Sequence, residues 1–190
     1  MVDPLDVGMI VVLSDTHRKE RPGLRGPLAA AVERADRVIH AGDFTTAAVL
    51  AGFQSAAREF LAVAGNRDEP AVADQLPAAR TLAVGPLTVA VTHRQRGGET
   101  GLAYFGAERD ADLVISGHTH QPHVIQGEGP TLLNPGSHAD PRGGPATYAV
   151  LEPDETGIAG TIYTLEGAER EEFRVEGRNG TETGTGMGRG

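Results

Sequence analysis

The chain of 190 residues contains no cysteine and no tryptophan, and its 26 acidic residues outnumber its 17 basic ones. Without cysteine there can be no disulfide, no thiolate metal site, no iron–sulfur cluster and no cysteine nucleophile. The formal net charge is −9, and lysine and arginine form no cluster along the chain, so we expect no nucleic-acid-binding patch. These absences exclude several classes of function before any motif is considered.

Long apolar segments are also missing. No stretch approaches the roughly 20 apolar residues of a membrane-spanning helix, so we expect no membrane contact and a cytoplasmic protein. The apolar segment Val7–Leu13 is short and has no basic leader, and it is predicted to be a buried strand rather than a signal peptide. The length suits one domain, predicted over residues 1–176, followed by a disordered glycine-rich tail over residues 177–190.

Short β-branched apolar segments alternate with alanine-rich helical segments as far as about His120. Strands are predicted at 9–13, 37–40, 60–63, 82–84, 87–91 and 113–116, and helices at 27–35, 46–53 and 102–108. This alternation is typical of the α/β class. After His120 only strands are predicted, at 123–126, 131–133, 146–151, 158–164 and 171–175, and we expect antiparallel hairpins that form a second sheet.

Side chains that can bind metal follow five of these strands directly. They are Asp15, His17, Asp43, Asn66, His93, His118 and His120. In open α/β sheets ligands bind beyond the carboxyl ends of the strands, so we expect all seven to converge on one rim. Seven nitrogen and oxygen ligands are too many for one tetrahedral zinc but suit two ions that share a carboxylate, and Asp43 is the predicted bridge.

Each piece taken alone also has an ordinary structural interpretation. Asp15 fits a helix cap, the Gly-Asp and Gly-Asn dipeptides fit plain turns, and His93 fits a hydrogen-bonded histidine. The segment Gly117-His118-Thr119-His120 is more specific, because an irregular turn can place both imidazoles on one centre. The ordered combination, with each piece at a strand end, favours a metal centre.

The motifs Asp-x-His, Gly-Asp, Gly-Asn, His and Gly-His-x-His are present in order and complete, and they resemble those of the calcineurin-like metallophosphoesterases. Asn134-Pro135-Gly136-Ser137 and Pro141-Arg142 extend the resemblance, over about residues 9–152, to the small prokaryotic phosphodiesterase branch. That branch is related to the metallophosphoesterase-fold subunit of eukaryotic retromer. The resemblance implies an α/β protein built as a four-layer α/β/β/α sandwich of two mixed sheets flanked by helices.

The resemblance also implies two divalent metal ions and divides the ligands between them. One ion is expected on Asp15, His17, Asp43 and His120. The other is expected on Asp43, Asn66, His93 and His118. We expect manganese, with iron, zinc, nickel or cobalt as alternatives, because a ligand set of nitrogen and oxygen does not choose among them.

The implied activity is two-metal hydrolysis of phosphate esters, phosphodiesters before phosphomonoesters, by a metal-bridging hydroxide. Asp43, Asn66 and Arg67 are expected to act in catalysis. Asn66 and Arg67 are also expected to bind the small-molecule phosphate ester, together with His138 and Arg142. His40 is expected to pack beside the ligands and His123 to stand on the wall of the site.

Two positions depart from the family pattern. Arg67 stands where many relatives have a histidine that protonates the leaving group, and arginine can clamp phosphate but cannot act as a general acid at ordinary pH. The branch usually reads His-Gly-His where this chain has His93-Arg94-Gln95. We therefore expect slow hydrolysis of diesters with good leaving groups, such as aryl phosphodiesters, and poor hydrolysis of alkyl monoesters.

Two other interpretations remain to be weighed. The spacing His118-x-His120-x-x-His123 fits zinc metallo-β-lactamase-type hydrolases, but Pro122 stands where that family needs an aspartate, and the motif comes last instead of early. The stronger alternative is a catalytically weak metallophosphoesterase-fold scaffold that binds a protein partner. Such scaffolds tend to lose ligands, and every ligand position is filled here, which favours an enzyme. Exposed apolar positions on the second sheet would allow a homodimer.

Overall fold

The computed structural model describes residues 8–177, and the predicted tail beyond Gly177 lies outside the described residues. One sheet contains β1 (Ile10–Leu13), β2 (Arg37–His40), β3 (Phe60–Ala62), β9 (Thr147–Pro153), β10 (Gly157–Thr164) and β11 (Glu169–Glu176). The other contains β4 (Ala79–Val84), β5 (Leu87–Thr92), β6 (Leu113–Ile115), β7 (His123–Ile125) and β8 (Thr131–Asn134). The helices are α1 (Gly26–Arg34), α2 (Ala47–Ala56), α3 (Pro70–Ala73) and α4 (Gly98–Ala107).

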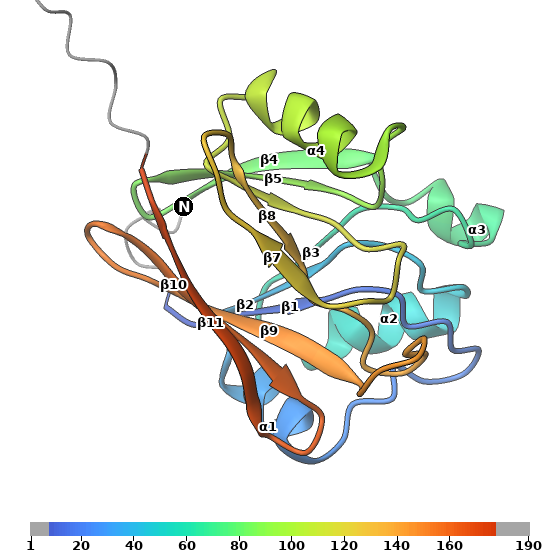
Figure 1. The fold of residues 1–190 in the computed structure, drawn as a ribbon. Helices are drawn as coiled ribbons and strands as arrows, with labels where there is room; N and C mark the ends of the chain where they lie inside the picture. The colour runs from blue at the N-terminus through green and yellow to red at the C-terminus, as the bar shows by residue number, and fades with distance from the viewer. Residues whose placement is uncertain (1–7, 178–190) are drawn as a thin grey trace, which may run out of the picture.

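The two sheets pack face to face, with α1 and α2 on the outer face of the first sheet and α4 on the outer face of the second (Figure 1). The strand order is β11-β10-β9-β1-β2-β3 in the first sheet and β4-β5-β6-β8-β7 in the second. Both sheets contain parallel and antiparallel pairs. The predicted four-layer α/β/β/α sandwich of two mixed sheets is confirmed.

The central strands are apolar on both faces because each face packs against a different layer. In β1, Ile10 and Val12 belong to the cluster between the sheets, while Val11 and Leu13 pack among residues of α1 and α2. In β6, Val114 lies on the α4 side. Successive side chains of a strand point to opposite faces, so a strand between two layers has no polar side to expose.

The prediction that the strands after His120 form a sheet of their own is wrong. Strand β8 runs parallel to β6, and β9 runs antiparallel to β1, with Val11 opposite Val150. The hairpin pairings β7–β8, β9–β10 and β10–β11 are antiparallel as expected. Since β1 and β6 are buried, their second edges need hydrogen-bond partners, and the late strands supply them.

The helices differ from the sequence-based expectation at two places. Helix α4 begins at Gly98, four residues before the predicted start, and Gly97 and Gly98 both have positive φ. Helix α4 contains three glycines, and glycine has a low helix propensity, so the sequence pattern disfavours a helix here. Glycine is nevertheless required at Gly101, because a Cβ there would collide with the carbonyl of Arg96 in the tight turn into α4. The single-turn helix α3 begins at Pro70 and is too short for its pattern to be recognised.

None of the helices in residues 8–177 is long and apolar enough to cross a bilayer. Within the same residues Tyr104 of α4 is the exposed large apolar side chain, and it does not lie on a sheet. Apolar side chains on the sheets are at most partly exposed in the described residues, and the homodimer stays a prediction.

Candidate metal centre

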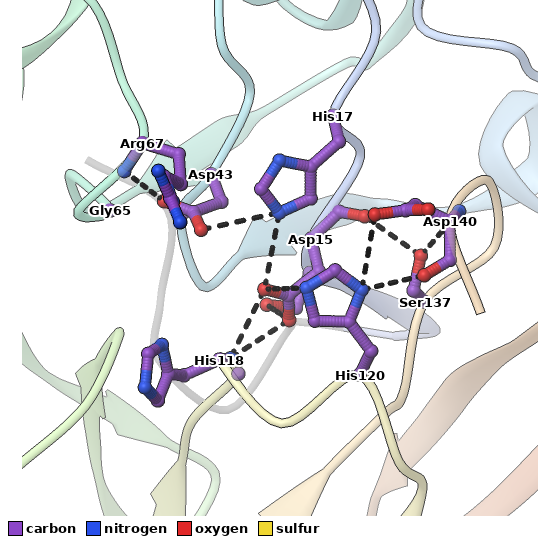
Figure 2. A network of polar contacts seen from close by, with 12 residues as sticks. Asp15, His17, Asp43, Gly65, Arg67, His118, His120, Ser137 and Asp140 are labelled. Atoms are coloured by element: carbon purple, nitrogen blue, oxygen red, sulfur yellow. Dashed lines mark hydrogen bonds and ion pairs between the residues drawn. The ribbon is translucent and has the colours of Figure 1, made fainter. Parts of the chain in front are cut away.

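The loops that leave five strands meet at one edge of the sandwich. Asp15 and His17 follow β1, Asp43 follows β2, and Asn66 follows β3, all from the first sheet. His93 follows β5, and the turn with His118 and His120 follows β6, all from the second sheet. The structure thus brings the predicted ligands together at a seam between the two sheets, with part of the cluster shown in Figure 2.

Asp15 is fully buried at the centre of the cluster, and the surrounding loops fix its carboxylate. Ser14 Oγ donates to Asp15 Oδ2 over 2.7 Å, and the backbone N–H of His118 donates to the same oxygen over 2.9 Å. His120 Nε2 lies 3.4 Å from Asp15 Oδ1, and the rings of His17 and His120 stack with centroids 4.8 Å apart. Asp15, His17 and His120 therefore form one group that can hold a metal ion.

Asp43 lies between histidines from the two sheets. Its Oδ2 is 3.3 Å from His17 Nε2 and 3.3 Å from His93 Nε2, and its Oδ1 accepts a 2.7 Å hydrogen bond from the backbone N–H of Arg67. Asp15, Asp43 and His93 form the second group that can hold a metal ion. Asp15 is the carboxylate common to the two groups, while Asp43 lies between a histidine of each sheet, and its bridging role stays a prediction.

Backbone carbonyls fix the orientation of two histidine rings. His93 Nδ1 donates to the carbonyl of Ala41 over 2.8 Å, and His120 Nδ1 donates to the carbonyl of Asp140 over 2.6 Å. With the proton on Nδ1, each neutral ring has the lone pair of Nε2 free to bind a metal ion. This arrangement is common for histidines that ligate metals.

The two remaining predicted ligands lie on the His93 side of the centre. Asn66 Oδ1 is 3.1 Å from His93 Nε2, and the His118 ring stands edge-on to the His93 ring at 5.4 Å. In Figure 2 the His118 ring points away from His17 and His120. Asn66 and His118 thus lie next to His93, and the division of the ligands between two ions stays a prediction.

Five of these seven residues have a left-handed backbone conformation. Their φ angles are 54° at Asp15, 43° at His17, 63° at Asp43, 74° at His118 and 62° at His120. Non-glycine residues adopt this region rarely, and such strained positions concentrate at functional sites. The loops are therefore held in costly conformations that point the side chains at a common centre.

The glycines that precede two of the ligands allow the backbone of one strand-end loop to pack directly against the residues of another. A Cβ at Gly65 would collide with Oδ1 and the backbone nitrogen of Asp43, and a Cβ at Gly117 would collide with Oγ of Ser14. Glycine is required at both positions because other strand-end loops occupy the space of a side chain.

Charge inside the cluster is strongly coupled. The carboxylates of Asp15 and Asp43 raise the pKa of His17 to about 9. Burial raises the pKa of Asp43, but the imidazoles of His17 and His93, each 3.3 Å away, outweigh it and hold that pKa well below its usual range. Burial lowers the pKa of His93, but the Asp43 carboxylate outweighs it and raises that pKa overall. Protons on histidines here balance the charge that a cation would otherwise balance.

The residues present fit divalent metal ions. Nε2 of His17 is buried beside two carboxylates and has no hydrogen-bond partner among residues 8–177. The donors are imidazole nitrogens and carboxylate and amide oxygens, which suit manganese, iron, zinc, nickel and cobalt. An unpartnered buried nitrogen next to carboxylates is the arrangement expected of a metal ligand.

The predicted substrate residues lie in different places. Arg67 is exposed beside Asn66, and Arg142 is exposed in the loop before β9. His138 is buried, donates from Nε2 to the carbonyl of Pro22 over 2.9 Å, and packs edge-on against Phe53.

Two further predicted histidines lie beside the ligands. His40 is buried, with Nε2 2.8 Å from Oγ1 of Thr16, and its Nδ1 accepts from the backbone N–H of Gly42. This second bond supports the turn that carries Asp43. His123 lines a cavity beside His118.

Sequence reasoning gave no role to the residues that brace the histidine turn. Asn134 Nδ2 donates to the carbonyl of Gly117 over 2.9 Å, and Ser137 Oγ donates to the carbonyl of Asp15 over 2.7 Å. Ser137 Oγ also accepts from the backbone N–H of Asp140, whose carbonyl holds His120. The signal was present, because Asn134-Pro135-Gly136-Ser137 belongs to the motifs that carry the family resemblance.

Two cavities flank the His93 side of the centre. The first, of about 370 Å³, includes Leu102, His118 and His123 in its wall, and we call it the Leu102 cavity. The second, of about 540 Å³, includes Asn66 and Arg109, and we call it the Arg109 cavity. The strip His93-Arg94-Gln95 lines both.

Comparison with known proteins agrees with this geometry. Residues 9–156 match the family model described as the calcineurin-like phosphoesterase superfamily domain. A probable metallophosphoesterase of Methanothermobacter thermautotrophicus is 35% identical over 138 residues, which cover 70% of this chain and 79% of that protein. A second, from Methanocaldococcus jannaschii, is 35% identical over 140 residues, covering 70% of each chain. The chain belongs to the calcineurin-like phosphoesterase superfamily, a family of metal-dependent phosphoesterases.

Solved structures show the same fold. The crystal structure of Vps29 from Entamoeba histolytica complexed with zinc has a TM-score of 0.71 and 22% identity, covering 87% of this chain and 98% of that one. At this identity the likeness concerns the fold alone.

Proposed function

We propose that this chain hydrolyses phosphodiesters with two divalent metal ions, manganese being the first choice. The observation that carries the proposal is the position of Asp43, whose Oδ2 lies 3.3 Å from a histidine of each sheet. Membership of the superfamily supports hydrolysis of a phosphate ester. A cytoplasmic location and a small-molecule substrate complete the proposal.

The residues divide as the family resemblance implies. Asp15, His17, Asp43 and His120 would hold one ion, and Asp43, Asn66, His93 and His118 the other. When bound, the ions supply an acidified water and positive charge against the phosphoryl oxygens. The carbonyls of Ala41 and Asp140 keep the His93 and His120 rings in the required orientation.

Asn66 and Arg67 would bind the phosphoryl group. Oδ1 of Asn66 faces His93, which leaves the Nδ2 hydrogens available to a phosphoryl oxygen. The Arg67 backbone holds Asp43, and its exposed guanidinium can clamp phosphate in two-point contact. Arg142, which is exposed, would act at the periphery, and the buried His138 would act only by supporting the loop that leads to Arg142.

Diesters with good leaving groups are the expected substrates. Arg67 and Gln95 occupy the positions at which relatives carry histidines, and neither a guanidinium nor a carboxamide releases a proton at ordinary pH. A leaving group such as p-nitrophenolate departs without protonation, whereas an alkoxide does not. The ratio of diester to alkyl monoester turnover should therefore be well above one.

The test is manganese-dependent hydrolysis of bis-p-nitrophenyl phosphate by the wild type, by Asp43→Ala and by Asp74→Ala. Asp74 is an exposed carboxylate at the end of α3 and serves as the matched control. We expect activity in the wild type and in Asp74→Ala, and a loss of at least about a hundredfold in Asp43→Ala. No activity in any of the three, with no metal found by elemental analysis, would refute the proposal.

A catalytically weak scaffold that binds a protein partner is the second candidate, because the chain shares its fold with Vps29. The filled ligand set argues for the enzyme, since a scaffold has no need for seven converging ligands. The scaffold becomes the better description if metal binds stoichiometrically and no phosphate ester is turned over.

A further inference from the structure

The Leu102 and Arg109 cavities share the strip His93-Arg94-Gln95 in their walls. The Leu102 cavity includes His118, and the Arg109 cavity includes Asn66, so each reaches one proposed ligand of the same ion. A phosphoryl group held between Asn66 and His118 would therefore adjoin both cavities. A phosphodiester has two arms, and each cavity has the volume of a small-molecule subsite.

The Arg109 cavity has the chemistry of an anion subsite. The Arg109 guanidinium lies 3.8 Å from the centroid of the Phe105 ring, and its Nη1 donates to the carbonyl of Phe105 over 3.0 Å. Nε and Nη2 of Arg109 have no hydrogen-bond partner among residues 8–177. A guanidinium stacked on a ring is fixed in orientation, so its free edge is arranged in advance to bind an anion.

Charge in this cavity is positive on balance. Glu108 is the acidic residue in its wall, mostly exposed, with Oε2 3.4 Å from Nη1 of Arg109. Arg94 stands in the same wall, and its exposed side chain has no ion pair among the described residues. Two arginines against one glutamate leave one positive charge next to the metal centre. Arg94 is also one of the two positions at which this chain departs from the family motif after His93.

We propose that the substrate is a phosphodiester with a second phosphate on one arm, and that Arg94 and Arg109 bind this second phosphate. The other arm lies in the Leu102 cavity. This inference rests on the proposed function, since it assigns the arms of a diester that the metal centre cleaves. Arg94 and Arg109 are specificity residues and make no contact with the scissile bond.

Two probes that differ by one phosphate test the inference. They are thymidine 5′-(p-nitrophenyl phosphate) and the same compound with a 3′-phosphate. For the manganese-loaded wild type we expect KM to be about tenfold lower for the second probe, with kcat little changed, because the added contacts form before the chemical step. Arg94→Gln and Arg109→Gln should each reduce this preference, and the double variant should abolish it.

Arg58→Gln is the matched control, because Arg58 is an exposed arginine in the loop before β3, at the end of the strand opposite Asn66. It should keep the wild-type preference. Arg109→Lys, which keeps the charge but not the planar fork, should keep part of it. Equal KM values for the two probes in the wild type, or a preference that survives in the double variant, would overturn the inference.

Calorimetric binding gives a readout that needs no turnover. Thymidine 3′,5′-bisphosphate should bind the metal-loaded wild type about tenfold more tightly than thymidine 5′-phosphate, and the double variant should bind both equally. If that difference holds while neither diester is hydrolysed, the proposed function fails and the anion subsite stands. If both diesters are hydrolysed with no preference, the subsite fails and the proposed function stands.

Discussion

The left-handed backbone at the ligand positions is the feature of single residues that sequence cannot reveal. The identity of Asp15 or His118 does not establish a positive φ, since aspartate and histidine adopt it more often than most residues but still rarely. The ligand types and their spacing could be predicted from the sequence, because strand ends and preceding glycines mark these positions. The backbone conformation of the ligands could not be predicted, because neighbouring loops impose it.

Strain at His118 predicts an order of stability between two variants. At φ 74° a glycine has no Cβ penalty, so metal-free His118→Gly should be more stable than His118→Ala by about 1 kcal/mol. Urea unfolding in the presence of a chelator measures the difference. Tyr104 in the exposed face of α4 is the control, where Gly should instead be less stable than Ala by about 1 kcal/mol. The same order at both positions would contradict the strain argument.

Burial of His138 predicts how stability changes in acid. Burial lowers the pKa of His138 to about 4, below the value of 6.5 for an unperturbed histidine. The unfolded chain therefore binds this proton between pH 6.5 and 4 while the folded protein does not, so the free energy of unfolding falls as pH falls through that range.

His138→Gln keeps an amide donor for the carbonyl of Pro22 and removes the titration. Between pH 6.5 and 4, the free energy of unfolding should fall less steeply with pH in His138→Gln than in the wild type. The two slopes should differ by at most about 1.4 kcal/mol per pH unit. Chemical unfolding at several pH values measures both slopes. Parallel slopes would show that His138 does not stay neutral in the folded protein.

At the scale of elements, the sequence predicted where strands lie better than how they pair. Strand β2 was predicted with its observed ends, and α2 begins one residue after the predicted start. These boundaries are local, since Thr46 caps α2 by accepting from the N–H of Val49. The pairing of β9 with β1 depends on the second edge of β1, which lies far from β9 in the sequence. Local sequence patterns therefore could not predict this pairing.

Gly65 tests whether close loop packing builds the metal centre. A Cβ there would collide with Asp43, so Gly65→Ala should displace the carboxylate and weaken metal binding by at least about tenfold. Gly129→Ala is the control, because a Cβ at that position would meet no atom within 4 Å. Equilibrium dialysis against a series of manganese concentrations measures the metal affinity of both variants. Wild-type affinity in Gly65→Ala would show that the loop after β3 can move aside without cost.

At the scale of the whole molecule, the ligands come from both sheets and join them. Asp15 and Asp43 belong to loops of the first sheet, while His93 and His120 belong to loops of the second. Metal bound between them should therefore stabilise the assembled sandwich and not only the loops.

Manganese at 100 times its Kd should raise the free energy of unfolding by about 2.7 kcal/mol. The rise should be seen as a higher Tm for the wild type and for Asp74→Ala, and it should be absent for Asp43→Ala. Differential scanning calorimetry with manganese and with a chelator gives the comparison. An equal rise in Asp43→Ala would place the stabilising metal elsewhere on the chain.

The pairing of β1 with β9 has a consequence for folding during synthesis. Ile10 emerges from the ribosome early, but its partner Leu151 emerges only after most of the chain has been made. Until then one edge of the apolar β1 has no partner, and such an edge can pair with the wrong strand or with another chain. Contacts between distant parts of a chain also form slowly. The strand that carries Asp15 and His17 to the centre thus completes its hydrogen bonding late, and nascent chains shorter than about 150 residues should need protection from aggregation.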